Sequence, residues 1–383
     1  MNIRISVAII VRNEEDCIKR CLISIIGKFD EYVIIDSGSH DKTQSLIMHE
    51  FESSKAPYRL IATTWNDDFS VPRNLAISNA TGDAIFFIDA DEVLLSDRNT
   101  LRHAFENIDP CCSAICPSIK NHDGQLIKDI PRGFFLKEGF YYYGFVHEEL
   151  RGEYKNIVKI SASRVLLYHD GYMDNVVKLK DKIHRNIDLN KKNIDSEPGN
   201  VRWVYFYCRD AIGFVDNNIL YNLALDILLI NKELLISKEN ISYTEYTPAL
   251  LDVMTMIQLE IICHTDEVPD SHFLALIEIM EYLRVNSGNI FFYKKIHDLF
   301  MWNKKAKQNL LEIIHHIKER DIDYQSSLHS EGYHIDQLLA IYLYENKMFN
   351  ESYKTIELIS NANYSTNILK KYKEYFKGYK VDE

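Results

Sequence analysis

The segment Ile85 to Glu92 constrains the fold of this chain more than any other. Four apolar residues, Ile85 to Ile88, run directly into two aspartates, Asp89 and Asp91. A short continuous apolar run predicts a strand buried on both faces, as in a parallel sheet. Residues two apart on an extended backbone point to the same side, and open α/β sheets bind ligands at the carboxyl ends of their strands. We therefore expect Asp89 and Asp91 to face one site.

Two carboxylates this close repel each other unless a cation lies between them. A hard divalent cation that also holds a diphosphate is the natural occupant, because Mg²⁺ in proteins is bound by one or two carboxylates together with substrate phosphates. The same Asp-x-Asp spacing is also common in turns and helix caps. The pair alone leaves both interpretations open.

The order of the predicted elements indicates an α/β domain followed by a helical one. Strands alternate with helices in the first part of the chain, which predicts a parallel, doubly wound sheet. Short β-like runs follow, and after Tyr172 the chain is helical in character. We expect domains at residues 1–175 and 176–383. Residues 334–360 are similar to a tetratricopeptide unit, although a generic helical bundle explains the pattern equally well. Strands are predicted at residues 3–11, 32–35, 58–62 and 85–88, and a helix at residues 70–80.

Composition excludes several classes of protein. The net charge of −12 argues against nucleic acid or an anionic membrane surface as the main partner. No apolar run reaches the ~18 residues of a membrane span, and the amino-terminal apolar stretch is too short for a signal peptide. The seven cysteines lack the spacing of zinc sites or disulfide frameworks. We expect a soluble, cytoplasmic protein with reduced thiols.

Four further segments carry polar side chains at predicted strand ends or loops. Asp36 ends the second strand, and its carboxylate could accept the N3–H of a uracil ring or belong to a helix cap. Arg73 opens a helix, where its guanidinium could brace Asp91 or a phosphate, or be solvated. Glu148 could serve as a general base, and His169 as a metal ligand or a structural histidine.

Taken together, four motifs carry a resemblance to a known family. In this order they resemble the family 2 glycosyltransferases of the GT-A fold, over residues 1 to about 175. The combination is far more specific than any one motif. The motifs are Val11-x-Asn13-Glu14-Glu15, Asp36-Ser37-Gly38-Ser39-x-Asp41-x-Thr43, Trp65-x3-Phe69-Ser70-x2-Arg73-Asn74 and Ile88-Asp89-Ala90-Asp91-Glu92.

A closer resemblance appears further along the chain. Four later motifs look like those of the sublancin-type peptide S-glycosyltransferases of glycocin biosynthesis, in which a GT-A domain precedes a helical, repeat-like domain. The Val-His-Glu and His-x-Gly patterns also resemble lipopolysaccharide-core enzymes, so they are less diagnostic of a peptide acceptor. The motifs are Phe145-Val146-His147-Glu148-Glu149, Tyr168-His169-Asp170-Gly171-Tyr172, Arg185-Asn186-Ile187-Asp188-Leu189 and Glu197-Pro198-x2-Val201-Arg202-Trp203.

The resemblance implies a UDP-sugar donor and a metal cofactor, Mg²⁺ or Mn²⁺. Asp36 would contact the uracil, and the backbone from Val11 to Asn13 would line the nucleotide. Asp89 would approach the ribose or the metal. Asp91 would ligate the metal, with His169 as a possible further ligand.

The resemblance also implies the catalytic residues. Arg73 and Arg132 would lie near the diphosphate. Glu148, next to His147, is the expected general base, and Glu149 is the alternative. Family 2 enzymes often carry this carboxylate in a different local pattern.

The implied reaction is a single displacement that inverts the anomeric carbon. A hexose or N-acetylhexosamine would pass to a loop Cys, or to Ser or Thr, of a bacteriocin-type precursor peptide. The helical domain would form a homodimer or hold the leader of that peptide. Two other readings stay open: a lipid-linked or polysaccharide acceptor, and a protein-binding scaffold that carries an inactive transferase domain.

Overall fold

The computed structural model describes residues 3–153, 157–169, 176–264, 271–300, 306–318 and 332–377. The chain divides into two compact units, Met1–Ser196 and Glu197–Glu383. The domain boundary expected at 175/176 adjoins residues 170–175, which lie outside the described residues. The division assigns helix α5 (Val176–Ser196) to the amino-terminal unit. The physical reason is that α5 side chains such as Asn193 bond directly to loops of that unit.

The amino-terminal unit is built on a nine-stranded mixed sheet in the order β3-β2-β1-β4-β8-β6-β11-β5, with β7 paired to β6. A separate two-stranded ribbon pairs β10 with β9. The strands are β1 (Ile5–Val11), β2 (Glu31–Asp36), β3 (Tyr58–Ala62), β4 (Ala84–Phe87), β5 (Glu92–Leu94), β6 (Ser113–Asn121), β7 (Leu126–Ile127), β8 (Gly133–Phe135), β9 (Tyr141–Tyr143), β10 (Glu149–Arg151) and β11 (Val158–His169).

The first four strands form the parallel, doubly wound sheet expected from the alternating pattern. Strand β1 pairs in parallel with both β2 and β4, and β2 pairs in parallel with β3. The strands β1, β2 and β4 are almost entirely buried, as apolar runs in a covered sheet should be. Their carboxyl ends therefore meet along one edge, where Val11 pairs with Asp36.

The rest of the sheet is mixed rather than parallel. Strand β8 runs antiparallel to β4 and to β6, and β5 runs antiparallel to β11. Gly133 makes the first of these pairings possible, since a Cβ there would lie within 2.9 Å of the Phe86 and Phe105 rings. The bare backbone of Gly133 thus lets β8 approach the strand that ends at Asp89.

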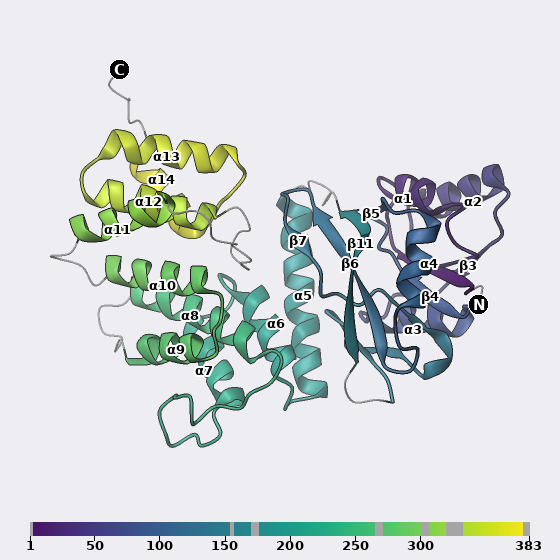
Figure 1. Cartoon of the computed structure of the whole chain (residues 1–383), viewed down its shortest axis with the longest axis horizontal. Helices are drawn as coiled ribbons and strands as arrows, with labels where there is room; N and C mark the ends of the chain where they lie inside the picture. The colour runs from purple at the N-terminus through teal and green to yellow at the C-terminus, as the bar shows by residue number, and fades with distance from the viewer. Residues whose placement is uncertain are drawn as a thin grey trace. The chain divides into compact units, whose positions relative to one another are not determined.

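Helices cover both faces of this sheet (Figure 1). Buried residues of α1, α2 and α4 join one core with β1 and β4, and α3 joins a second core with Phe140 and Tyr142 on the opposite face. The unit is therefore a three-layer α/β structure. Its helices are α1 (Ile18–Ile25), α2 (Thr43–Ser54), α3 (Ser70–Asn79), α4 (Arg98–Glu106), the 3₁₀ turn Leu136–Glu138, and α5.

The regular secondary structure of the carboxy-terminal unit is helical in its described residues, apart from two isolated β-bridges (Figure 1). Each helix packs against a neighbour along the chain, as in α7 with α8, α11 with α12, and α12 with α13. The helix-turn-helix expected at 334–360 is present as α12 and α13. The helices are α6 (Val201–Ala211), α7 (Asn217–Leu228), α8 (Thr247–His264), α9 (Ser271–Tyr282), α10 (Ser287–Phe300), α11 (Ala306–Lys318), α12 (Tyr333–Glu345), α13 (Phe349–Asn361) and α14 (Asn367–Tyr375).

None of the described helices is long and apolar enough to cross a membrane.

Candidate active site

Asp36 lies at the carboxyl end of β2 and is fully buried. Its Oδ1 accepts hydrogen bonds from the backbone N–H of Gly38 at 2.9 Å and of Ser39 at 2.7 Å. Its Oδ2 and the neighbouring Ser37 hydroxyl have no hydrogen-bond partner among the described residues. A buried polar atom without a partner is costly, so Asp36 Oδ2 is an acceptor suited to a ligand N–H.

Asn13 links the loop after β1 to the loop after β2. Its backbone N–H donates to Ser39 Oγ at 3.0 Å, and its Oδ1 accepts from the His40 N–H at 2.8 Å. Its φ of 58° lies in the left-handed region, which asparagine tolerates better than most residues. Val11 pairs with Asp36 in register. The structure therefore brings together the three residues expected to line the nucleotide.

Asp89 follows β4 and lies between two arginines. Its Oδ2 accepts from Arg132 Nη2 at 2.7 Å, and its Oδ1 from Arg73 Nη2 at 3.3 Å. Burial alone would raise the pKa of Asp89, but Arg132 and Arg73 together hold it well below its usual range. The Asp89 side chain is 39% exposed while those of Arg73 and Arg132 are 14% and 6% exposed. The carboxylate is therefore accessible above two buried cations.

Glu92 is the buried counterpart of Asp89. Its Oε1 accepts from Arg132 Nη2 at 2.8 Å, and its Oε2 accepts from the Asp89 backbone N–H at 2.9 Å. Burial, with a smaller effect of nearby Asp89, raises the pKa of Glu92 above its ordinary value. Sequence reasoning gave Glu92 no role. It positions both Arg132 and the backbone of Asp89.

Arg73 also joins the site to Glu148. The Arg73 Nε donates to Glu148 Oε1 in a close ion pair. The guanidinium stacks over the rings of Phe87 and Tyr142, at 5.4 and 5.2 Å. Glu148 is only 10% exposed, and its Oε2 has no hydrogen-bond partner in the part of the chain that the structure describes. That oxygen is open to an acceptor proton.

Glu149 takes a different partner from Glu148. It lies in β10 and forms an ion pair with Arg151. His147, between this strand and the preceding loop, has a φ of 53°. Asn193 of α5 holds that loop, because it accepts from the Phe145 N–H at 2.7 Å and donates to the Val146 carbonyl at 2.9 Å. This backbone geometry separates the two glutamates.

Asp91 and His169 meet at the next position along the edge. His169 Nε2 lies 2.9 Å from Asp91 Oδ2, and its Nδ1 lies 3.3 Å from Asn121 Oδ1. The hydrogen bond to Asp91 raises the pKa of His169. Across the described residues, no group of three or more His, Cys, Asp or Glu side chains is arranged to hold a metal ion. The remainder of the Tyr168–Tyr172 motif, from Asp170 on, lies outside the described residues.

Tyr142 of β9 is a further group at this site. Its ring packs edge-on against Phe87, and Asn74 holds its backbone through two hydrogen bonds of 2.8 Å. Its hydroxyl is buried without a partner, and burial raises its pKa to about 12. A neutral phenol therefore lies among the charged groups of Arg73 and Glu148.

The expected site residues fall into two neighbouring groups. The structure links Asp89, Arg73, Arg132 and Glu148 in one ion-paired network and places Asp91 with His169 beside it. Asp36, Val11 and Asn13 form a neighbouring cluster at the ends of β2 and β1. His147 and Glu149 belong to the same loop and strand as Glu148, but no contact joins Glu149 to Arg73 among the bonds described.

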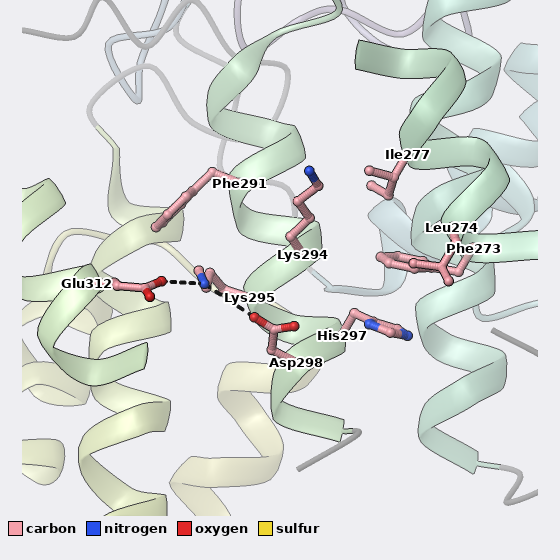
Figure 2. Close-up of a pocket in the computed structure, with 9 residues that line it drawn as sticks. All are labelled: Phe273, Leu274, Ile277, Phe291, Lys294, Lys295, His297, Asp298 and Glu312. Atoms are coloured by element: carbon pink, nitrogen blue, oxygen red, sulfur yellow. Dashed lines mark hydrogen bonds and ion pairs between the residues drawn. The ribbon is translucent and has the colours of Figure 1, made fainter. Parts of the chain in front are cut away.

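Among the described residues, a hollow of about 500 Å³ runs along α5 and is lined by residues that include Asp67, Arg185 and Lys192. A second, of about 470 Å³, lies in the helical unit and is shown in Figure 2. In it Lys295 Nζ contacts Glu312 at 2.7 Å and Asp298 at 3.3 Å. That lysine is already paired, which makes the second hollow a poor anion site.

The sequence of the amino-terminal unit is similar to known glycosyltransferases. Residues 6–170 match the family model described as "Glycosyl transferase family 2". The glycosyltransferase SunS of Bacillus subtilis (strain 168) is 34% identical over 213 residues, covering 54% of this chain and 49% of SunS. The chain thus spans about half the length of that relative.

Two other similarities concern shorter or more distant matches. A TPR repeat-containing protein of Synechococcus elongatus is 41% identical over 92 residues, which are 24% of this chain and 21% of that protein. The crystal structure of Staphylococcus aureus TarS 1–349 in complex with UDP-GlcNAc is 13% identical with a TM-score of 0.37, and the match covers 83% of this chain and 93% of TarS 1–349.

The family match spans the strands that end at Asp36 and Asp89 and extends to His169 at the end of β11. It therefore covers the whole edge described above. Residues 6–170 are therefore similar to the family 2 glycosyltransferases, and the fold is a GT-A-type α/β domain followed by a tetratricopeptide-like helical region.

Proposed function

We propose that this protein transfers a hexose or N-acetylhexosamine from a UDP-sugar to a Cys side chain, or to Ser or Thr, of a ribosomally made bacteriocin-type peptide. The observation that carries the proposal is the link from Asp89 through Arg73 to Glu148. It holds a candidate base beside the predicted donor site. The peptide acceptor is supported by the identity with SunS and by the resemblance of the later motifs to the sublancin-type enzymes.

The donor nucleotide would bind at the ends of β1 and β2. Asp36 Oδ2, buried without a partner, suits the N3–H of uracil, and the backbone from Val11 to Asn13 would line the ring and ribose. Asp89 would approach the ribose, since its accessible carboxylate is held in the ionised form by Arg73 and Arg132.

Asp91 and His169 fit a divalent cation, Mg²⁺ or Mn²⁺. A carboxylate oxygen and an imidazole nitrogen that face each other at 2.9 Å suit two adjacent ligand positions, and diphosphate oxygens and water commonly fill the others. When bound, such a cation neutralises charge on the departing diphosphate, which is worth several kcal/mol.

Glu148 is the proposed base. As the acceptor sulfur or oxygen forms its bond to the anomeric carbon, the bond from that carbon to the diphosphate oxygen breaks and UDP leaves. Glu148 Oε2 takes the acceptor proton, while Arg73 keeps the carboxylate in place through Oε1. Attack from the face opposite the leaving group inverts the anomeric configuration.

The chemistry of the acceptor atom favours cysteine. A thiol ionises near pH 8.5, so a carboxylate faces a modest uphill proton transfer. A serine hydroxyl is far more reluctant and needs proton removal that is concerted with attack. We therefore expect transfer to Cys to be faster than transfer to Ser at the same position of a peptide.

The test is intact-mass spectrometry of two matched helix-loop-helix peptides, one with a loop Cys and one with Ser. Each is incubated with the protein, Mn²⁺ or Mg²⁺, and a panel of UDP-sugars. We expect a gain of one hexose or N-acetylhexosamine on the Cys peptide. Asp91→Ala should abolish the gain, whereas Glu52→Ala, at an exposed position of α2, should not.

The outcomes separate the proposal from its alternatives. UDP release without any peptide product would refute the peptide acceptor and favour a lipid-linked or polysaccharide acceptor. A protein that turns over no UDP-sugar, and whose Asp91→Ala variant still supports the cellular function, would favour the scaffold reading.

We further propose that the protein works in the cytoplasm and that its helical unit mediates a homodimer or holds the peptide leader. Cys17, Cys21, Cys111, Cys112, Cys116 and Cys208 are free thiols, as is usual in a reducing compartment. Size-exclusion chromatography with light scattering, with and without the precursor peptide, distinguishes the two uses of the helical unit.

A further inference from the structure

Two arginines near the predicted donor site have no ion-pair partner among the described residues. Arg12 is exposed and directly follows β1. Arg185 of α5 is partly buried, its Nε is buried without a partner, and its hydrogen bond goes to the amide Oδ1 of Asn186 at 3.1 Å. Burial, and then the positive charge of Arg12, lower the pKa of Arg185 below its ordinary value, while the nearby carboxylate of Asp67 opposes them. Two neighbouring guanidiniums of this kind favour an anion.

An aromatic pair holds both guanidiniums in place. Arg12 lies over the Trp65 ring at 5.3 Å, and Arg185 lies over the Phe69 ring at 5.2 Å. The two rings contact each other edge to face, with centroids 4.7 Å apart. Asp67 accepts from the Trp65 indole N–H at 2.8 Å and so fixes that ring. Stacked arginines of this kind lose little freedom on binding a ligand.

Arg73 and Arg132, the arginines expected at the diphosphate, differ from this pair. Both are buried, and each contacts two carboxylates: Asp89 and Glu148 for Arg73, Asp89 and Glu92 for Arg132. A guanidinium whose donors already serve carboxylates has little to offer a phosphate. Beside the proposed divalent cation, the side-chain positive charge that meets the donor diphosphate must then come from other residues.

Arg12 and Arg185 are placed to do so. Arg12 lies between Val11 and Asn13, the residues expected to line the nucleotide. The next residue along, Glu14, lies close enough to both Asp91 and Lys182 of α5 for each to affect its pKa. The basic turn of α5 that carries Lys182 and Arg185 therefore flanks the same strand ends as the predicted metal ligand.

We propose that Arg12 and Arg185, stacked on Trp65 and Phe69, bind the diphosphate of the nucleotide donor and of the released nucleoside diphosphate. This inference rests on the proposed function for the nature of the donor. It assigns the leaving-group contact to Arg12, after β1, and to Arg185 of α5, with the loop 63–69 supplying the rings on which they stack, rather than to Arg73 and Arg132.

The test is isothermal titration of the full chain with UDP, UMP and uridine, in Mn²⁺ and again in EDTA. Arg185→Gln and Arg12→Gln should each weaken UDP binding by about 10- to 100-fold, as expected for losing charge-assisted hydrogen bonds. Uridine binding should be unchanged. Arg185→Lys, which keeps the charge and loses the planar fork, should fall between Gln and wild type.

A matched control is available on the same helix. Lys191→Gln removes one exposed positive charge that has no aromatic platform, so it should leave UDP affinity near wild type. UDP binding by Arg185→Gln and Arg12→Gln as tight as that of Lys191→Gln would overturn the inference, as would an equal loss for uridine and UDP.

The inference and the proposed function can fail separately. Normal UDP affinity in both variants, together with intact sugar transfer, would overturn the inference alone. A wild-type protein that binds GDP but not UDP would refute the proposed donor, and the same variants titrated with GDP would still decide the role of the arginines. A wild-type protein that binds neither would refute both.

Discussion

Acidic residues at the amino ends of the parallel strands, the amino edge, have more bonding partners than those at the carboxyl ends, the carboxyl edge. At the amino edge, Glu31 accepts hydrogen bonds from Ser6 Oγ at 2.5 Å, the Thr81 N–H at 2.7 Å and Thr81 Oγ1 at 2.9 Å. It also pairs with Arg59 at 3.1 Å. Asp30 there accepts from the Ile5 N–H at 2.9 Å and pairs with helix α4. These carboxylates are bonded to several strands and helices at once.

The carboxyl edge leaves acceptors and cations open. Asp36 Oδ2 has no partner, Asp89 and Asp91 are 39% and 31% exposed, and Arg12 lacks a carboxylate among the described residues. The difference shows that a cluster of charges is not a site by itself. The amino edge uses charge to hold strands together, while the carboxyl edge keeps atoms available, where α/β sheets bind ligands.

The largest effect is expected at the carboxyl edge, from a change at Glu148. Glu148→Gln keeps an oxygen that can accept from Arg73 but cannot take a proton, so sugar transfer should fall by about 10²- to 10⁴-fold. Initial rates of UDP release with the peptide acceptor measure the loss. Glu149→Gln, at the neighbouring position paired with Arg151, should retain near wild-type turnover. Equal losses in the two variants would remove Glu148 as the base.

A change at Arg132 tests whether ion pairs at the carboxyl edge also stabilise the fold. Arg132→Met would leave buried Glu92 and the nearby Asp89 without their shared cation, and breaking a buried pair in this way costs about 3–5 kcal/mol. Native-state hydrogen exchange of the β4 and β8 amides reports the local loss. The double variant Arg132→Met/Glu92→Met should recover part of it, because the second change removes the stranded carboxylate. No recovery would show that packing, rather than charge, is at stake.

Much of the carboxyl edge could be predicted from sequence because it depends on local pattern. The apolar runs that lead to Asp36 and Asp89 have the length and composition of buried strands, and the carboxyl ends of parallel strands lie together at one edge of a sheet. The position of Asp91 on the same side as Asp89 is predicted because alternate residues of an extended chain point the same way. The helix predicted at 70–80, with Arg73 in its first turn, is present as α3 (Ser70–Asn79).

The remaining partners could not be predicted because they depend on long-range pairing. Nothing in the local pattern around Arg132 says that antiparallel β8 inserts between β4 and β6 and brings this arginine to Glu92. Gly133, which allows the close approach to Phe86, is a signal only once the pairing is known. The stacking of Arg185 on Phe69 likewise needs the packing of α5.

Glu31 should give a smaller effect, confined to the amino edge. Glu31→Gln replaces a carboxylate that accepts three hydrogen bonds with a neutral amide, so we expect a loss of about 1.5–3 kcal/mol in local stability. Hydrogen exchange of the β1 and β2 amides provides the measurement. UDP affinity should be unchanged, because no predicted ligand contact lies at this edge. A variant that lost UDP binding while keeping its exchange protection would contradict the separation of the two edges.

The smallest effect is expected from acid acting on the same carboxylate. Burial opposes ionisation of Glu31, but hydrogen bonds from Ser6 and Thr81, with Arg59 nearby, hold its pKa below its ordinary value of 4.5. A carboxylate with a lowered native pKa stabilises the fold fully above its unfolded pKa, and that stability is lost as the pH falls through the native pKa. Exchange protection at β1 and β2 in the wild type should therefore decline below pH 4.5, while Glu31→Gln should show a flatter dependence. Parallel curves for the two proteins would mean that other acids, such as Asp30, dominate the acid sensitivity of this edge.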